Sequence, residues 1–409
     1  MIITIINCHI SNRGDEAAIH SLVDEIIYMY PDVRINLLIR GDTIYPNMPD
    51  SVRMLRQFIP GDFRSLIAFY VALLTRGKIK VSSSGKRTLE AMQEANIILH
   101  APGGPSIGDT YYNAEPTYLR LYDLARVMNK PYMFYAPSMG PFERKERNRW
   151  RKRIIGKARA VVLRDPISAE HVRRLLPNKK LYQTLDSALQ HDIDYIFNQS
   201  IFEQYIELKK FISSHKKCIG VTITDLSWHP IHSKNTNIRK GIQDTFLDVI
   251  DNLTKDGYGI VFIPQLYGSG NDYDLMKTYC LNDENYFIIP ANEDRYDAYF
   301  QQYLIGQLYA VIGMRYHSNI FSAKMGTPFI SVSYEQKMQG FMEKMDLLDY
   351  CIRIDDLSVN NLKEKFDILV NNYDEYKKYL KDKHDDMKRE AYKTTEILQR
   401  TIKDLGNDR

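Results

Sequence analysis

Arg315 and His317 are the residues whose types and spacing best suit chemistry on an anion. The apolar run Ala310–Gly313 predicts a strand and Asn319–Lys324 predicts a helix, which leaves Met314–Ser318 as the connecting loop. A phosphate at the start of that helix would meet oriented N–H groups and the positive end of the helix dipole. The guanidinium of Arg315 can hold a phosphate or carboxylate by two parallel bonds, and His317 can exchange a proton near neutral pH. We therefore predict an anion site with an acid–base group here; the alternative is that His317 is structural.

Three further side chains of the second half are predicted to join this site. Ser318 can cap the helix that follows the loop. Tyr334 and Lys337 follow the predicted strand Phe329–Val332 and would flank the same pocket, because loops after parallel strands lie at one edge of the sheet. For Lys337 the alternative is a solvated position on a helix.

In the first half, Asn12, Gly14 and Asp15 follow the predicted strand Ile2–Ile6 and open a helix near Glu16–Tyr30. Glycine lets the backbone turn tightly, and the start of a helix offers unbonded N–H groups to a ligand. Asp15 is predicted either as a functional group or as the N-cap, which is the commonest role of an aspartate at such a position.

A glycine-rich stretch, Ala101–Asp109 (APGGPSIGD), follows another predicted strand. Gly103 and Gly104 would let the backbone approach a ligand closely. The spacing is not the GxGxxG of dinucleotide-binding proteins, so a nicotinamide cofactor is not inferred. The side chains that follow suit the hydroxyls and faces of a sugar: Asp109, Tyr111 and Tyr112. A structural turn is the alternative.

Arg164 ends the predicted strand Ala160–Leu163 and would point toward a ligand at the sheet edge. A structural ion pair is weighed equally for this arginine. Asp165 is expected to cap the next helix, with Pro166 at its first position.

Short β-branched runs that alternate with amphipathic helical stretches predict the elements that hold these loops. Strands are expected at 2–6, 34–39, 96–100, 131–135, 160–163, 180–184, 218–223, 259–263, 286–289, 310–313 and 329–332. The fold class is therefore α/β, with two Rossmann-like domains facing a central cleft and a long C-terminal helical tail. Residues 1–200 form the first domain, 201–360 the second and 361–409 the tail.

The bulk composition narrows the function classes. The 409 residues carry a net charge of +4, which is too small to indicate nucleic acid and fits anionic small substrates or an anionic membrane surface. Four separated cysteines without CxxC, and no HExxH motif, predict no metal site and no disulfide framework. No signal peptide is found, and Leu66–Leu74 is too short to span a bilayer. The expected location is cytoplasmic, with peripheral contact at the inner face of the cell membrane left open.

The basic run Arg144–Arg153 is expected to be a solvated face or a contact with anionic lipid headgroups.

Taken together, these loops resemble the polysaccharide pyruvyl transferase family. The pieces that carry the resemblance run in order along most of the chain: Asn12-x-Gly14-Asp15-Glu16-Ala17, Gly103-Gly104, Arg164-Asp165 with Ser168, Asp186-Ser187-Ala188, Gly313-Met314-Arg315-Tyr316-His317-Ser318, Gly326-x-Pro328 and Tyr334-x-x-Lys337. One departure is Pro105, where the family has a third glycine.

The resemblance implies a GT-B-like fold and transfer of a pyruvyl group from phosphoenolpyruvate to a sugar of a surface polysaccharide or its lipid-linked precursor. A pyruvate ketal would form and phosphate would be released, with phosphoenolpyruvate as co-substrate and no further cofactor. Donor residues would be Arg315, Arg164, Ser318, Tyr316, Lys337 and Tyr334, with His317 as the acid and one of Asp15 or Asp109 as the base. Acceptor residues would be Asn12, Gly103, Gly104, Asp109, Tyr111 and Tyr112.

Two rival functions remain open at the level of sequence. A nucleotide-sugar glycosyltransferase of the same fold would use Arg315 and His317 on a diphosphate, and Glu335 and Glu343 have the E-x7-E spacing of several such enzymes. A catalytically silent assembly protein of a polysaccharide locus is the second rival, and the intact Arg315/His317 pair argues against it.

Overall fold

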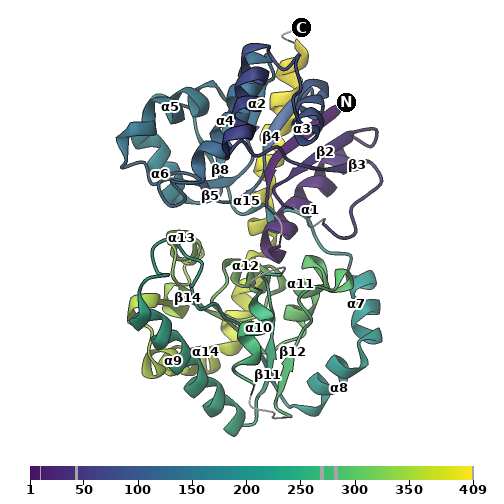
Figure 1. Cartoon of the computed structure of the whole chain (residues 1–409). Coiled ribbons are helices and arrows are strands. Elements are labelled where there is room, and N and C mark those ends of the chain that lie inside the picture. Colours follow the sequence, from purple (N-terminus) through teal and green to yellow (C-terminus); the bar gives the residue numbers. More distant parts are fainter. Residues whose placement is uncertain (10, 42–44, 268–270, 281–283, 408–409) are drawn as a thin grey trace. The chain divides into compact units, whose positions relative to one another are not determined.

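The computed structural model describes residues 1–409 except 10, 42–44, 268–270, 281–283 and 408–409. Its contacts divide the chain into two compact units, each assembled from segments distant in the sequence (Figure 1). Unit 1 comprises Met1–Ile10, Ala18–His191 and Arg389–Arg409, and unit 2 comprises Ser11–Ala17 and Asp192–Lys388. The main division therefore falls at 191/192, where the sequence predicted 200/201.

Unit 1 contains a parallel sheet with the strand order β3-β2-β1-β4-β6-β8-β9. Its strands are β1 (Ile2–Cys8), β2 (Arg34–Ile39), β3 (Val52–Arg56), β4 (Ile97–His100), β6 (Tyr132–Phe134), β8 (Ala160–Leu163) and β9 (Tyr182–Gln183). The helices are α1 (Arg13–Met29, whose first turn belongs to unit 2), α2 (Phe63–Leu74), α3 (Ser83–Glu94), α4 (Glu115–Val127), α5 (Asn148–Lys157) and α6 (Pro166–Leu175). β1, β4, β6 and β8 are almost entirely buried, as expected where helices cover both faces of a parallel sheet.

Unit 2 contains a second parallel sheet with the order β12-β11-β10-β13-β14-β15. Its strands are β10 (Cys218–Thr222), β11 (Gly259–Phe262), β12 (Tyr286–Ile288), β13 (Ala310–Gly313), β14 (Phe329–Ser333) and β15 (Cys351–Arg353). The helices are α7 (Tyr195–Gln204), α8 (Ile206–Ser214), α9 (Thr236–Lys255), α10 (Asp272–Lys277), α11 (Ala298–Gly306), α12 (Tyr316–Met325), α13 (Gln336–Lys344) and α14 (Val359–Asn371).

In each sheet the strand order reverses beside the first strand of the unit, between β1 and β4 and between β10 and β13. In open α/β sheets, ligands bind outside the carboxyl ends of the strands at this switch point. The parallel sheets and their order confirm the predicted α/β class with two Rossmann-like halves. They also single out the loops after β1, β4, β10 and β13.

The predicted tail, 361–409, contains most of α14 and one long helix, α15 (Tyr373–Asn407), whose residues are shared between the units. In unit 2, Tyr376 donates to the carbonyl of Phe329 at 3.0 Å. In unit 1, Thr395 donates to Gln190 at 2.9 Å, and Ile397 and Leu398 join the apolar core beneath the sheet. The tail is thus part of both cores.

Three features of unit 1 differ from the sequence-based expectations. β3 and α3 were not predicted. The glycine-rich stretch was expected to be a loop, but it contains a strand, β5 (Gly103–Ile107), which pairs with β7 (Pro137–Met139) in a small parallel sheet. Gly103 has a φ of 154°, so this strand begins in a backbone conformation that favours glycine.

No helix in the described part of the chain combines the length and apolar character that a membrane span requires.

Candidate active site

The turn between β13 and α12 is held by short side chains packed against β10. Gly313 ends β13, and a Cβ at this position would lie 1.9 Å from the Asn319 side chain, so only glycine allows the helix to approach the strand this closely. The hydroxyl of Thr222, at the end of β10, accepts from the N–H groups of Met314 and Arg315 at 3.1 and 3.2 Å. This places Arg315 at the switch point of unit 2.

Helix α12 begins at Tyr316, three residues earlier than the sequence predicted, so Tyr316, His317 and Ser318 lie in its first turn. The expectation that Ser318 caps the helix was wrong, because Arg315 occupies the N-cap position and makes no side-chain cap bond. Ser318 is fully buried, and its hydroxyl bonds to the Arg315 carbonyl at 2.6 Å and to Thr222 at 2.8 Å. Its position holds the turn, and a contact with the donor stays a prediction.

Arg315 is buried and bound by Asp272, the first residue of α10. The Arg315 Nε lies 3.1 Å from Asp272 Oδ2, and Nη2 binds the other carboxylate oxygen. Burial acts against the charged guanidinium, but Asp272 and Tyr334 outweigh it and the pKa of Arg315 lies above its ordinary value. The Arg315 Cζ also lies 5.4 Å from the ring centroid of Trp228. Arg315 is therefore fixed in one orientation before any ligand binds, while its fork has five donors, more than Asp272 uses.

A second charged cluster lies on the loop after β14. The Glu335 carboxylate contacts Lys337 Nζ at 2.6 Å and His229 Nε2 at 3.2 Å. Burial alone would raise the pKa of Glu335, but Lys337 and His229 outweigh it and lower the pKa to about 2. Burial and the neighbouring Glu335 raise the pKa of Tyr334, which keeps its phenol protonated. The charge of Lys337 is therefore paired with that of Glu335, the residue next to Tyr334.

His317 packs against the first motif of the chain. An alanine Cβ at Gly14 would lie 1.8 Å from His317 Nδ1 and 2.5 Å from its Cβ, so the backbone at Gly14 touches the whole histidine side chain. The Asn12 side chain accepts from the Gly14 N–H at 2.8 Å, which makes Asn12 the residue that caps α1. Asp15, for which the cap was one of two predicted roles, instead lies inside the first turn, half-buried and next to Gly14. The structure thus brings Gly14 against His317, and Asn12 and Asp15 lie within two residues of that contact along the chain.

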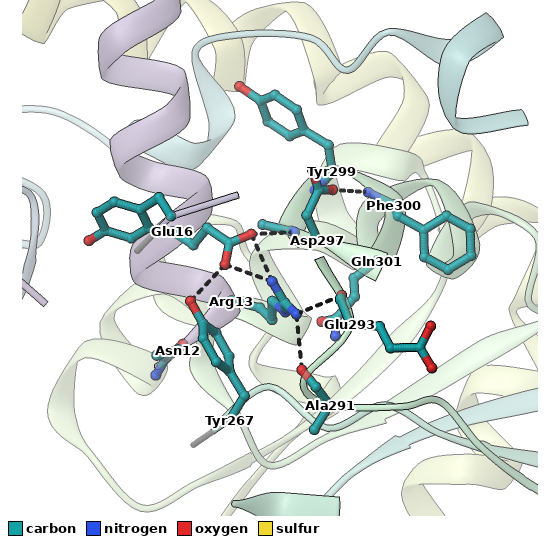
Figure 2. Close-up of polar contacts among 12 residues, drawn as sticks. Asn12, Arg13, Glu16, Tyr267, Ala291, Glu293, Asp297, Tyr299, Phe300 and Gln301 are labelled. Carbon is teal, nitrogen blue, oxygen red and sulfur yellow. Dashed lines mark hydrogen bonds and ion pairs between the residues drawn. The ribbon is translucent and has the colours of Figure 1, made fainter. Parts of the chain in front are cut away.

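A buried ion pair anchors this motif to unit 2 (Figure 2). Arg13 and Glu16 contact one another at 2.9 Å and are almost completely buried. Glu16 also accepts from the Tyr267 hydroxyl at 2.9 Å and from the Ala298 N–H at 2.7 Å. Arg13 donates to two carbonyls of the segment after β12, those of Ala291 and Glu293, at 2.9 and 3.2 Å. Because these contacts fix the buried Glu16 carboxylate in one position, we assign Glu16 the role of holding the neighbouring Gly14 in place.

Asp272 connects this anchor to Arg315. Its Oδ2 atom accepts from the backbone N–H groups of Gln265 and Leu266 at 3.1 and 2.9 Å, in addition to Arg315 Nε. The same two residues pair with the motif, because the Arg13 N–H donates to the Gln265 carbonyl at 2.8 Å and Asn12 bridges to Leu266. One carboxylate therefore fixes both the arginine and the strand-like segment on which Gly14 rests.

In unit 1, Arg164 is buried and forms an ion pair with Asp186, and its Nε donates to Ser138 at 3.0 Å. Asp165 caps α6 through the Ser168 N–H at 2.7 Å, as predicted. The structural ion pair weighed for Arg164 is thus present, and a contact between Arg164 and the donor stays a prediction.

The predicted acceptor residues lie on two elements of unit 1. Gly103 and Gly104 begin β5, and a Cβ at Gly104 would meet nothing within 4 Å, which leaves open space beside this backbone. Asp109 accepts from Arg151 Nη2 at 2.7 Å and from the Arg144 N–H at 2.9 Å. Tyr112 lies beneath Arg147, 3.6 Å from its Cζ, and Tyr111 lies beside it in the same half-buried turn.

These contacts correct the expectation for the basic run Arg144–Arg153. Arg151 is fully buried and bonds to both Asp109 and Glu115, so this run is not simply a solvated or lipid-facing surface. Its central arginine instead fixes the turn that carries Asp109 and Tyr112.

Several residues near the two switch points were not predicted as site residues from the sequence. In unit 2 these are Asp272, Trp228, His229 and His232; in unit 1 they are His9, Arg40 and His100. His9 Nε2 lies 2.9 Å from the Tyr118 hydroxyl, and the Arg40 Cζ lies 3.8 Å from the centroid of the Tyr118 ring. Burial, together with His9 and Arg40, lowers the pKa of His100 to about 3, so this histidine is neutral. Only their place in the sequence could have pointed to the residues of unit 1, because His9, Arg40 and His100 lie at or directly after the ends of strands.

Comparison with solved structures defines the class of fold. The chain is similar to the S. aureus MnaA–UDP co-structure (TM-score 0.58, 9% identity, 97% of this chain and 94% of that one). It is also similar to the UDP-GlcNAc 2-epimerase of Neisseria meningitidis (TM-score 0.55, 11% identity, 98% and 99%) and to a ugt transferase of Siraitia grosvenorii (TM-score 0.54, 10% identity, 99% and 100%). At these identities the likeness establishes a GT-B-like fold.

The sequence gives the family. Residues 12–336 match the family described as polysaccharide pyruvyl transferase, and the chain belongs to that family. The match begins at Asn12 and ends at Gln336, so it includes the anchored motif and the β13–α12 turn. A curated relative is the amylovoran biosynthesis protein AmsJ of Erwinia amylovora, which is 21% identical over 392 residues, covering 89% of this chain and 90% of the relative. The protein is accordingly a transferase of polysaccharide biosynthesis.

Proposed function

We propose that the protein transfers the pyruvyl group of phosphoenolpyruvate to two hydroxyls of one sugar, so that a pyruvate ketal forms and phosphate is released. The observation that carries the proposal is the contact of Gly14 with His317 beside a preoriented Arg315, in a chain of this family. Phosphoenolpyruvate carries a carboxylate and a phosphate, and both suit an arginine at a helix start.

In the proposed reaction, His317 donates a proton to the methylene carbon of the enol phosphate, and the adjacent carbon becomes electrophilic. A sugar hydroxyl adds to that carbon, and its proton passes to a base, for which Asp15 is proposed because it follows Gly14. Phosphate leaves with the electron pair of the C–O bond, and a second hydroxyl of the sugar closes the ketal while its proton passes to His317. Arg315, assisted by Tyr316, Tyr334 and Lys337 around the turn, would hold the carboxylate and phosphate as their charge changes.

The neighbours of His317 support an acid–base role. The ring lies in the first turn of α12, and the Gly14 backbone restricts its movement. A group that is held in one position transfers a proton over a fixed distance, which lowers the barrier. The nucleotide-sugar rival has less support, because Glu335 is committed to Lys337 and His229 while Glu343 is exposed on α13.

For the acceptor we propose a sugar of a surface polysaccharide or of its polyprenyl-linked precursor. Its proposed contacts in unit 1 are Gly103, the open side of Gly104, Asp109, Tyr111 and Tyr112. Open space beside Gly104 supports this proposal, because a glycine has no Cβ and lets a ligand approach the backbone closely.

The decisive experiment incubates the purified chain with phosphoenolpyruvate and a panel of free, chromogenic and lipid-linked sugars. We expect phosphate release that depends on the sugar, and a product heavier than the acceptor by pyruvate minus water. His317→Ala should abolish product, whereas His384→Ala, a more exposed histidine on α15, should leave product formation unchanged. Release of a nucleotide from a nucleotide sugar, with no reaction of phosphoenolpyruvate, would establish the rival function instead.

A further inference from the structure

Helix α2 presents an apolar stripe to solvent. Phe63, Ile67, Tyr70 and Leu74 are between 47% and 84% exposed. Their intervals of four, three and four residues place them on one face of the helix. The opposite face is buried in unit 1: Ala68, Phe69 and Ala72. The helix therefore packs on unit 1 with one face, and its other face leaves four large apolar side chains exposed to solvent.

The exposed stripe continues beyond the helix. Ile79 and Val81, in the segment that leads to α3, are both more than half exposed. Scattered apolar side chains on a surface are ordinary, but a contiguous set marks a surface that is covered when the protein works. We call Phe63–Val81 the α2 surface.

Positive charge surrounds this surface. Residues 56–87 contain seven lysines and arginines and a single acidic residue, Asp62. Asp62 is committed to the start of α2, where its carboxylate accepts from the N–H groups of Arg64 and Ser65 at 2.9 and 3.0 Å. Five of these cations lie on α2 or after it and are exposed, one in the first turn of α2 and four after its end: Arg64, Arg76, Lys78, Lys86 and Arg87.

We propose that the α2 surface is a membrane-docking surface, and that it lies on a bilayer whose headgroups are anionic. An amphipathic helix of this kind buries its apolar face at the headgroup boundary while flanking cations bind anionic lipid. Twelve residues rise only about 18 Å, so α2 lies on the surface and does not cross the bilayer.

Charge argues against a second copy of this chain as the partner. A two-fold interface would bring the same patch from both subunits together, and with it two sets of cations and little acid to balance them. A lipid surface with anionic headgroups presents the opposite charge. It also covers an apolar stripe without requiring a complementary pocket.

The proposal does not rest on the donor or the acceptor, since none of the residues of the α2 surface is part of the proposed chemistry. It gives a lipid-linked acceptor a simple route, because an enzyme held at the membrane meets such an acceptor at high local concentration.

The test is co-sedimentation of the full chain with vesicles. We expect binding to phosphatidylcholine vesicles that contain phosphatidylglycerol, weak binding to phosphatidylcholine alone, and a loss of binding as salt rises. The double variant Phe63→Ser/Leu74→Ser should weaken binding roughly tenfold to a hundredfold, because two large apolar side chains no longer enter the lipid.

A matched control is available elsewhere on the molecule. Tyr28 and Ile196 are 79% and 81% exposed, compared with 78% and 84% for Phe63 and Leu74. Tyr28→Ser/Ile196→Ser should therefore bind vesicles like the wild type, and both double variants should unfold at the wild-type temperature. The proposal is overturned if the wild type ignores anionic vesicles, if both double variants bind equally, or if Phe63→Ser/Leu74→Ser instead converts a dimer into a monomer in sedimentation velocity.

Discussion

The contact between Gly14 and His317 can be tested by adding a single methyl group. In Gly14→Ala the new Cβ would lie 1.8 Å from His317 Nδ1, 2.0 Å from Cγ and 2.5 Å from Cβ. Because all three atoms belong to the same side chain, a small rotation of the ring cannot relieve the clash. The histidine must leave its position by more than about 1 Å, a displacement that costs about 10²-fold in rate when the group is catalytic.

We therefore expect kcat of Gly14→Ala with phosphoenolpyruvate to fall about 10²-fold, measured as phosphate release at saturating donor. The free energy of unfolding should fall by about 1–3 kcal/mol, which is usual for an overpacked site and leaves the chain folded. Gly241→Ala on α9 is the matched control, because a Cβ there meets nothing within 4 Å. A Gly14→Ala enzyme with wild-type kcat would refute the reasoning, since it would show that the position of His317 does not govern the reaction.

Three further variants test the partners of the site. Glu16→Gln should lower the free energy of unfolding by about 3–5 kcal/mol in urea denaturation, because Arg13 would keep a buried charge without its carboxylate. Glu335, whose pKa is lowered from 4.5 to about 2, should contribute roughly 3 kcal/mol above pH 4.5, and this contribution should disappear as pH falls toward 2. The stability difference between wild type and Glu335→Gln at pH 5, 4 and 3 measures it. Arg315→Lys should weaken phosphoenolpyruvate binding by about tenfold to a hundredfold in calorimetry, because lysine cannot bind two oxygens side by side.

Each of these three variants has a matched control substitution at an exposed residue of the same chain. Glu170→Gln removes an exposed ion pair with Arg174 and should change stability by no more than about 1 kcal/mol. Glu343→Gln, exposed on α13, should show no pH-dependent difference, and Arg353→Lys should bind phosphoenolpyruvate like the wild type. If Glu16→Gln were as mild as Glu170→Gln, the motif would not depend on its buried ion pair.

The parts of the fold that the sequence predicts are those with a strong local pattern. β1, β4, β10 and β13 are runs of buried β-branched and aliphatic residues, and such runs can hardly be anything but central parallel strands. β5 was missed because glycine and proline rarely form strands, and this one pairs only with the three-residue β7. The start of α12 was misplaced because Arg315, at its N-cap, has no capping side chain.

The residues of the candidate site also divide into those that a local pattern predicts and those that it does not. Arg315, His317 and Gly14 were found because each follows a strand, a rule that needs only the order of elements. Asp272 and Glu16 carry much of the geometry, yet their partners lie 43 and 282 residues away along the chain. No local pattern encodes such a pairing. The direction of each side chain is set by tertiary packing, and this explains why Ser318 faces Thr222 while the arginine beside it is held by α10.

The shared helix α15 has a consequence for how the chain is made. Unit 1 is finished only by Arg389–Asn407, where Thr394 bonds to Thr184 at 2.8 Å and Leu398 is fully buried. A ribosome synthesises these residues only after Asp192–Lys388 of unit 2, so the earlier part of unit 1 must wait, with an incomplete core, until that segment has been made. A chain that stopped before Arg389 would therefore lack part of the core of unit 1, the unit whose synthesis begins first.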